Sequence, residues 1–191
     1  MNRFRKAAIW GVSLVIMSGF LAAAINADDH GKRHRRGERR HSENSHHGDR
    51  NLTPIRNSAY VDRCGSCHFA YQPELLPAES WRKILDGTED HFGETLDLDL
   101  DPSERAEIAG YLASNAADMS PAKLPRKIMR SLNGATPLRI TEIPCIRKEH
   151  HEVSSQVLKR RSVGSLSNCI ACHRTADKGV YDDDDVFIPE Q

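Results

Sequence analysis

Two short stretches of the sequence decide its architecture: Cys64-Gly65-Ser66-Cys67-His68 and Cys169-Ile170-Ala171-Cys172-His173. Both have the pattern Cys-x-x-Cys-His, which has a chemical reason. Thiols three residues apart on a helical turn face the same side, so both can form thioethers with the two vinyl groups of one haem. The histidine that follows supplies the proximal ligand of the iron. We therefore expect two covalently bound haem c groups, attached through Cys64, Cys67, Cys169 and Cys172, with His68 and His173 as proximal ligands.

Other interpretations of the same residues explain less. A zinc site made from both cysteine pairs has to close across about a hundred intervening residues, far from the compact spacing of zinc ribbons. A redox-active or purely structural cysteine pair gives no role to His68 or His173. Two haems also supply large apolar bodies to a chain in which 6% of the residues are aromatic and the mean hydropathy is -0.60.

The first 27 residues predict a secretory signal peptide. Arg3, Arg5 and Lys6 precede an apolar stretch at residues 7–25, and small residues at positions 22–27 offer cleavage sites. The stretch is also near the length that spans a bilayer, so an uncleaved anchor that keeps the protein close to the membrane is the alternative. In both cases the rest of the chain is exported, and we expect a periplasmic location.

Residues 28–50 predict a disordered tether. They contain seven basic residues, five acidic residues and five histidines without apolar periodicity, so they cannot bury enough surface to offset their ordering entropy. A solvated linker is favoured over binding of stray metal, anionic lipid or an acidic partner, because the histidines have no fixed ligand geometry. The cytochrome domain itself is expected at residues 51–191.

The neutral total charge, from 27 basic and 27 acidic residues, hides a segregation along the chain. The leader carries +3, the tether +2 and residues 51–191 carry -5, from 17 basic and 22 acidic residues. Haem propionates add to the negative charge of that domain. We therefore expect a partner with a basic docking face and no nucleic-acid partner.

The group at the sixth position of each iron decides between electron transfer and substrate chemistry. The candidates outside the two motifs and the tether are His91, His150, His151, Met119 and Met129. Residues 77–92 predict an amphipathic helix that carries His91 on its apolar face, which favours a ligand over a satisfied core histidine. Residues 145–153 predict a second helix whose apolar stripe includes His150 but not His151. Periodicity alone leaves His150 open between a ligand and a solvated histidine, and Met119 is expected to pack.

Further local signals complete the expected fold. Asp101, Pro102 and Glu104 predict the start of a helix, and residues 138–144 predict an extended segment. Cys145, the cysteine outside both motifs, is interpreted as a small buried hydrophobe, with redox-active, intermolecular or haem-ligating sulfur as alternatives. The acidic run at residues 182–185 lacks the pattern of a calcium loop and is expected to be solvated or to serve in docking. The fold class is all-α, with short helices and loops around two haems and little or no sheet.

Over residues 60–189 these features resemble the periplasmic dihaem cytochromes c, the family called DHC. The resemblance is carried by both Cys-x-x-Cys-His motifs, Leu76-Pro77, Ser80-Trp81, Asp90-His91-Phe92-Gly93, Tyr111-Leu112, Pro137-Leu138-Arg139-Ile140-Thr141, Glu149-His150 and Asn168. It implies a mostly helical cytochrome whose haems are both bis-histidine ligated, with His91 and His150 as distal ligands. It also implies electron exchange with other exported cytochromes or a membrane b-type cytochrome. Cys145-Ile146 departs from the family, in which an aromatic residue follows Pro144.

The expected function follows from this coordination. Histidine on both faces of an iron leaves no open position for oxygen, peroxide or nitrite, so outer-sphere electron transfer remains. We expect an electron carrier and not an enzyme. The alternatives are a small peroxidase or reductase, in which His91 or His150 acts as a distal acid or base, and a haem-based sensor with one open iron site. The sequence does not decide which distal histidine serves which haem.

Overall fold

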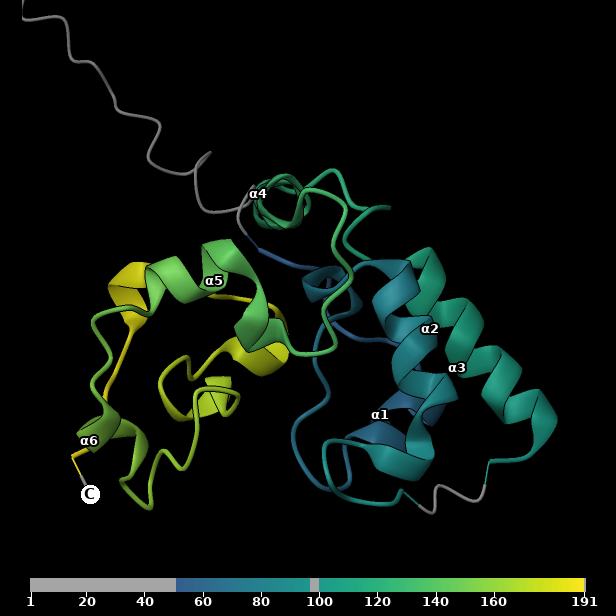
Figure 1. Cartoon of the computed structure of the whole chain (residues 1–191), viewed down its shortest axis with the longest axis horizontal. Coiled ribbons are helices and arrows are strands. Elements are labelled where there is room, and N and C mark those ends of the chain that lie inside the picture. Colours follow the sequence, from purple (N-terminus) through teal and green to yellow (C-terminus); the bar gives the residue numbers. More distant parts are fainter. Residues whose placement is uncertain (1–50, 97–99, 191) are drawn as a thin grey trace, which may run out of the picture. The chain divides into compact units, whose positions relative to one another are not determined.

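The structure is a computed structural model that describes residues 51–96 and 100–190, and this part of the chain is helical (Figure 1). Its α-helices are α1 (Ser58–Cys64), α2 (Ala78–Asp86), α3 (Pro102–Ser114), α4 (Lys123–Leu132), α5 (Pro144–Glu149) and α6 (Ser155–Leu158). Short 3-10 helices are η2 (Pro73–Leu75), η3 (Thr88–Asp90), η4 (Ile140–Glu142), η5 (Cys169–Ala171), η6 (Ala176–Lys178) and η7 (Asp183–Asp185). Within the described ranges the only strand-like pairing is an isolated bridge between His91 and Glu94. The all-α prediction is confirmed, whereas the expected leader (1–27) and tether (28–50) lie outside the described residues.

Helix α3 begins where the sequence predicts it. The side chain of Asp101 caps the helix by accepting hydrogen bonds from the backbone N–H groups of Ser103 and Glu104, and Pro102 occupies the first turn. The Glu104 side chain does not return to the cap. It accepts a 2.7 Å hydrogen bond from Nε of Arg63, which ties α3 to the end of α1.

The hydrophobic core lies mainly where α1 and α2 pack on α3 (Figure 1). Ile108 and Leu112 of α3 are almost completely buried there, next to side chains from the other two helices. The Tyr60 ring meets the Trp81 ring edge-on at 6.3 Å, and Trp81 Nε1 donates a 2.8 Å hydrogen bond to the Pro73 carbonyl. This arrangement makes a rigid wall behind the first Cys-x-x-Cys-His motif.

The C-terminal part of the chain has much less core of its own. Helix α4 packs on α5 and buries Pro125, Ile128 and Leu132. Beyond α5, however, Val163 and Ala176 are the hydrophobic side chains of residues 150–190 that are fully buried. None of the helices in residues 51–96 and 100–190 is long and apolar enough to cross a bilayer.

Several local expectations are wrong. The helix expected at residues 77–92 stops at Asp86, because the chain turns at Gly87, whose N–H bonds back to the Lys83 and Ile84 carbonyls, and a 3-10 turn follows. The segment 138–144 is not extended, since it contains η4 and the first residue of α5. Met119 does not pack, because 64% of its surface is exposed. The expected burial of Cys145 is confirmed, with 7% exposed.

Candidate functional site

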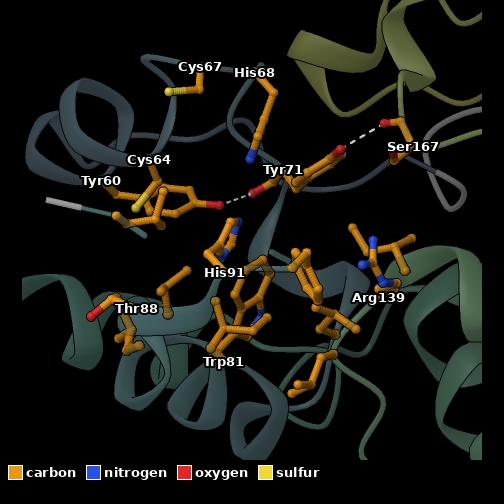
Figure 2. A pocket seen from close by; sticks show the side chains of 18 of the residues that line it. Tyr60, Cys64, Cys67, His68, Tyr71, Trp81, Thr88, His91, Arg139 and Ser167 are labelled. Atoms are coloured by element: carbon orange, nitrogen blue, oxygen red, sulfur yellow. Dashed lines mark hydrogen bonds between the residues drawn. The ribbon is translucent and has the colours of Figure 1, made fainter. Parts of the chain in front are cut away.

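A cavity of about 270 Å³ lies beside the first Cys-x-x-Cys-His motif (Figure 2). Most of its lining is apolar, including Leu76, Trp81 and Leu112 from the core. The polar and sulfur-bearing residues of the lining include Cys64, Cys67, His68 and His91. An apolar cavity that brings two thiols and two imidazoles together suits a flat apolar cofactor that takes thioether links and axial ligands.

His68 and His91 point toward each other from opposite sides of this cavity (Figure 2). Their ring centres are 6.4 Å apart and the ring planes differ by 14°. Two metal–nitrogen bonds of about 2.0 Å each, together with the two rings, put the ring centres roughly 6 Å apart. The two imidazoles therefore stand at the separation that one iron between them requires.

A tight turn aims His91 at the cavity. The backbone of His91 exchanges two hydrogen bonds with that of Glu94, at 2.7 and 3.3 Å. The residues between them, Phe92 and Gly93, both have positive φ, at 62° and 99°. The Asp90 carboxylate accepts a 2.9 Å hydrogen bond from the Gly93 N–H and closes the turn. The helical pattern predicted that His91 lies on the apolar side of this segment. The turn places His91 on that side, although His91 is not part of a helix.

The second motif forms a corresponding pair. Cys169 is the first residue of the 3-10 helix η5, and Cys172 and His173 come directly after this helix. His150 directly follows α5 as its C-cap residue, and its Nδ1 lies 2.8 Å from the Ile146 carbonyl one turn earlier, which fixes the ring. The rings of His150 and His173 are 6.0 Å apart, with planes at 68°. His151 instead is exposed, with its Nδ1 2.7 Å from the Lys148 carbonyl.

Burial favours the neutral form of one imidazole in each pair. Desolvation lowers the pKa of His91, and the nearby His68 and Arg139 lower it further. Desolvation and the neighbouring His150 lower the pKa of His173, against an opposing effect of Asp183. Neutral imidazole is the form that binds a metal. Burial also raises the pKa values of the Cys64 and Cys169 thiols to about 11.

The structure adds residues that the sequence motifs did not assign to the sites. Arg139 stacks on Phe92 with its guanidinium carbon 3.9 Å from the ring centre, and it lines the cavity. Tyr71 and Tyr181 pack their rings against His68 and His173, at 5.0 and 5.5 Å. Arg139 lies in a segment that the resemblance singled out, whereas neither tyrosine stands in a recognisable pattern.

These pairs fit haem better than the alternatives. No group of three or more metal-binding side chains that could hold an ion occurs among residues 51–96 and 100–190, and the five cysteines there form no disulfide. A porphyrin supplies four nitrogens itself, so the protein has to add only two axial ligands, and each pair contains two imidazoles of the kind required. The thioether roles of the cysteines and the ligand roles of the four histidines stay predictions.

Comparison with known proteins supports the same cofactor. Residues 60–181 match the family described as dihaem cytochrome c. The diheme cytochrome c from Rhodobacter sphaeroides is 38% identical, with 68% of this chain and 100% of that chain covered and a TM-score of 0.59. The diheme cytochrome type c from Shewanella baltica OS155 is 36% identical, with 70% and 93% covered and a TM-score of 0.55. No curated protein sequence matches the chain.

A match over well more than half of the chain, with structural relatives above 30% identity that it covers almost completely, establishes the family. The same family accounts for both Cys-x-x-Cys-His motifs and for the helical fold. The chain therefore belongs to the dihaem cytochrome c family and carries two covalently bound haem c groups.

Proposed function

We propose that this protein is an exported electron carrier that relays single electrons through two bis-histidine haems. One site uses His68 and His91, and the other uses His150 and His173. The observation that carries this proposal is the separation of the paired rings, 6.4 and 6.0 Å, which matches two axial ligands on one metal. Family membership supports a carrier in general terms, and these two distances support the ligand pairing.

The side chains of both sites suit electron transfer. Haem iron takes up and releases one electron by changing between its ferric and ferrous states. His91 and His150 block the position at which a substrate has to bind, because each faces the proximal histidine at ligand distance. The apolar side chains that line the first cavity exclude water, so little solvent has to reorganise when the charge changes. A carrier of this kind needs no acid or base that acts on a substrate.

The location and partners of the protein are part of the proposal. Its N-terminal leader supports export to the periplasm. In the alternative case the leader is not cleaved and anchors the protein at the membrane. Other exported cytochromes or a membrane b-type cytochrome are the partners that we propose, because a covalently attached haem pair has to exchange electrons with soluble or membrane-bound redox centres. Mixing the reduced protein with isolated candidate partners and following the haem bands tests this choice.

Absorption and EPR spectra of the purified protein test the coordination. Two low-spin haems are expected in both oxidation states, without rapid binding of carbon monoxide. The two ferric EPR signals should differ, because the ring planes stand at 14° in one pair and at 68° in the other. Near-parallel imidazoles give a rhombic low-spin signal, whereas near-perpendicular imidazoles give one dominant low-field feature.

Substitution of the distal histidines tests the pairing itself. His91→Gly and His150→Gly should each convert one haem to high spin and remove a different EPR signal, because each site loses one axial ligand. His151→Gly is the matched control and should leave both signals in place. A high-spin haem in the unaltered protein that binds peroxide rapidly contradicts the carrier proposal and favours a peroxidase or reductase.

A further inference from the structure

Tyr71 and Gln72, just after the first haem-binding motif, make long-range contacts with the last part of the chain. The Tyr71 hydroxyl donates a 2.7 Å hydrogen bond to the carbonyl of Ser167, two residues before Cys169 (Figure 2). The Gln72 side chain is completely buried, and its Nε2 donates a 2.6 Å hydrogen bond to the carbonyl of Ala176, three residues after His173. Tyr71 and Gln72, which are neighbours in the sequence, therefore hold the chain on both sides of the second motif.

Tyr181 completes this connection from the other half of the chain. Its hydroxyl donates a 2.7 Å hydrogen bond to Oε1 of Gln72. Both polar ends of the Gln72 amide are thus satisfied by groups more than a hundred residues away, at separations of 104 and 109 positions. If either partner were lost, one polar atom of the buried Gln72 amide would have no hydrogen bond. Disturbing these two contacts therefore costs free energy.

The outer ends of the same connection touch the proximal histidines. The Tyr71 ring is 5.0 Å from the ring of His68, and the Tyr181 ring is 5.5 Å from that of His173. From one proximal ligand to the other, the path runs through two ring contacts, one peptide link and one hydrogen bond. We call Tyr71, Gln72 and Tyr181 the inter-site bridge.

Gln72 of the inter-site bridge is completely buried, and Tyr71 and Tyr181 are half-buried. A simple packing role explains the burial of the three residues. It gives no reason why both ring contacts fall on the proximal ligands.

We propose that the inter-site bridge positions the two haem sites for electron exchange with each other, so that its three members are positioning residues for internal transfer. This inference rests on the proposed carrier function. In the step concerned, one ferrous iron loses one electron and the ferric iron of the other site gains it, with no proton or other reactant involved. The bridge fixes the spacing and the relative orientation at which this exchange takes place.

Variants of the haem-loaded protein test the proposal. Tyr181→Phe keeps the ring against His173 but removes the hydrogen bond to Gln72, and Gln72→Leu removes both long-range bonds of the amide. Ser120→Ala is the matched control, because it removes a 2.7 Å hydrogen bond to Glu74, 46 positions away, and neither residue lines the cavity. The rate of electron exchange between the haems is measured on half-reduced protein, from line widths and exchange spectroscopy of the haem methyl NMR signals.

Tyr181→Phe and Gln72→Leu should slow the internal exchange severalfold while both haems remain low-spin, and Ser120→Ala should exchange at the original rate. Unchanged rates in both bridge variants overturn the proposal, as does an equal slowing in Ser120→Ala. If Gln72→Leu does not fold, Tyr181→Phe and Tyr71→Phe decide by the same criterion. A high-spin haem in the unaltered protein counts against the carrier function instead, so the two failures are distinguishable.

Discussion

Arg139 places a permanent positive charge beside the first haem site. Its guanidinium lies 3.9 Å from the centre of the Phe92 ring, next to His91, and it lines the cavity. Its side chain is 47% exposed, and the Glu142 carboxylate 4.0 Å from its Nε offsets part of the charge. A cation near an iron favours the ferrous state, since reduction lowers the positive charge of the iron by one unit.

Arg139→Leu should therefore lower the reduction potential of the haem at the first motif, on the order of tens of millivolts after solvent screening. Arg139→Lys keeps the charge and should shift the potential less, although it loses the planar stacking on Phe92. A spectroelectrochemical titration measures both potentials. Arg126→Leu is the control, because it removes the same charge from the exposed face of α4. An equal shift of the reduction potential in that variant contradicts a local effect of Arg139.

At the scale of elements, the turn between His91 and Glu94 controls where His91, the proposed distal ligand, points. Gly93 has a φ of 99°, a backbone conformation in which a residue with a side chain is strained. A Cβ at this position meets no atom within 4 Å. Gly93→Ala should therefore destabilise the turn through backbone strain alone, by about 1 kcal/mol or more, and raise the high-spin fraction of the first haem. Denaturant unfolding and absorption spectra measure the two effects.

Gly110 provides the control for this substitution. It lies inside α3, where a Cβ also meets no atom within 4 Å, but its backbone is helical. Gly110→Ala should stabilise the protein by about 0.5–1 kcal/mol, because alanine loses less conformational freedom in a helix than glycine does. Equal effects of the two substitutions would show that the turn at Gly93 is not strained by a side chain.

Local sequence patterns predict some of these elements and miss others. The cap at Asp101 is local, so the start of α3 followed directly from the sequence. The apolar face that includes His91 was recognised, but the helix expected to carry it ends at Asp86 because the chain turns at Gly87. His91 reaches the same side through a turn that depends on two positive φ angles. The Gln72 contacts, which span more than a hundred residues, leave no periodic trace in the sequence.

At the scale of the whole molecule, the two haem sites rest on unequal amounts of protein core. The first stands against α1–α3, whereas the hydrophobic side chains fully buried within residues 150–190 are Val163 and Ala176. The second haem therefore has to supply most of the apolar interior of its surroundings. A Cys169→Ala, Cys172→Ala variant that lacks this haem should lose amide protection across α6 and η6 but keep it in α2 and α3. Hydrogen exchange measures this, and simultaneous loss in both regions contradicts it.

The two parts of the chain that contain the two haem-binding motifs also differ in net charge. Residues 51–118, which contain Cys64, Cys67, His68 and His91, include five basic and 13 acidic residues. Residues 119–191, which contain His150, Cys169, Cys172 and His173, include 12 basic and nine acidic residues. The net negative charge of the domain therefore lies in residues 51–118, the part of the chain that contains the first motif. A partner with a basic face should therefore dock on the part of the molecule that carries the first haem.

Small charged reductants distinguish the two sites without a protein partner. A cationic reductant such as hexaammineruthenium(II) should reduce the first haem faster than an anionic one of similar driving force does, by roughly tenfold at low ionic strength. This preference should fade as salt is added, because the Debye length falls to about 10 Å at 0.1 M. The second haem should show a weaker preference of the opposite sign. Stopped-flow mixing followed by freeze-quench EPR assigns each rate to its haem, and identical salt dependence at both haems contradicts two electrostatically distinct sites.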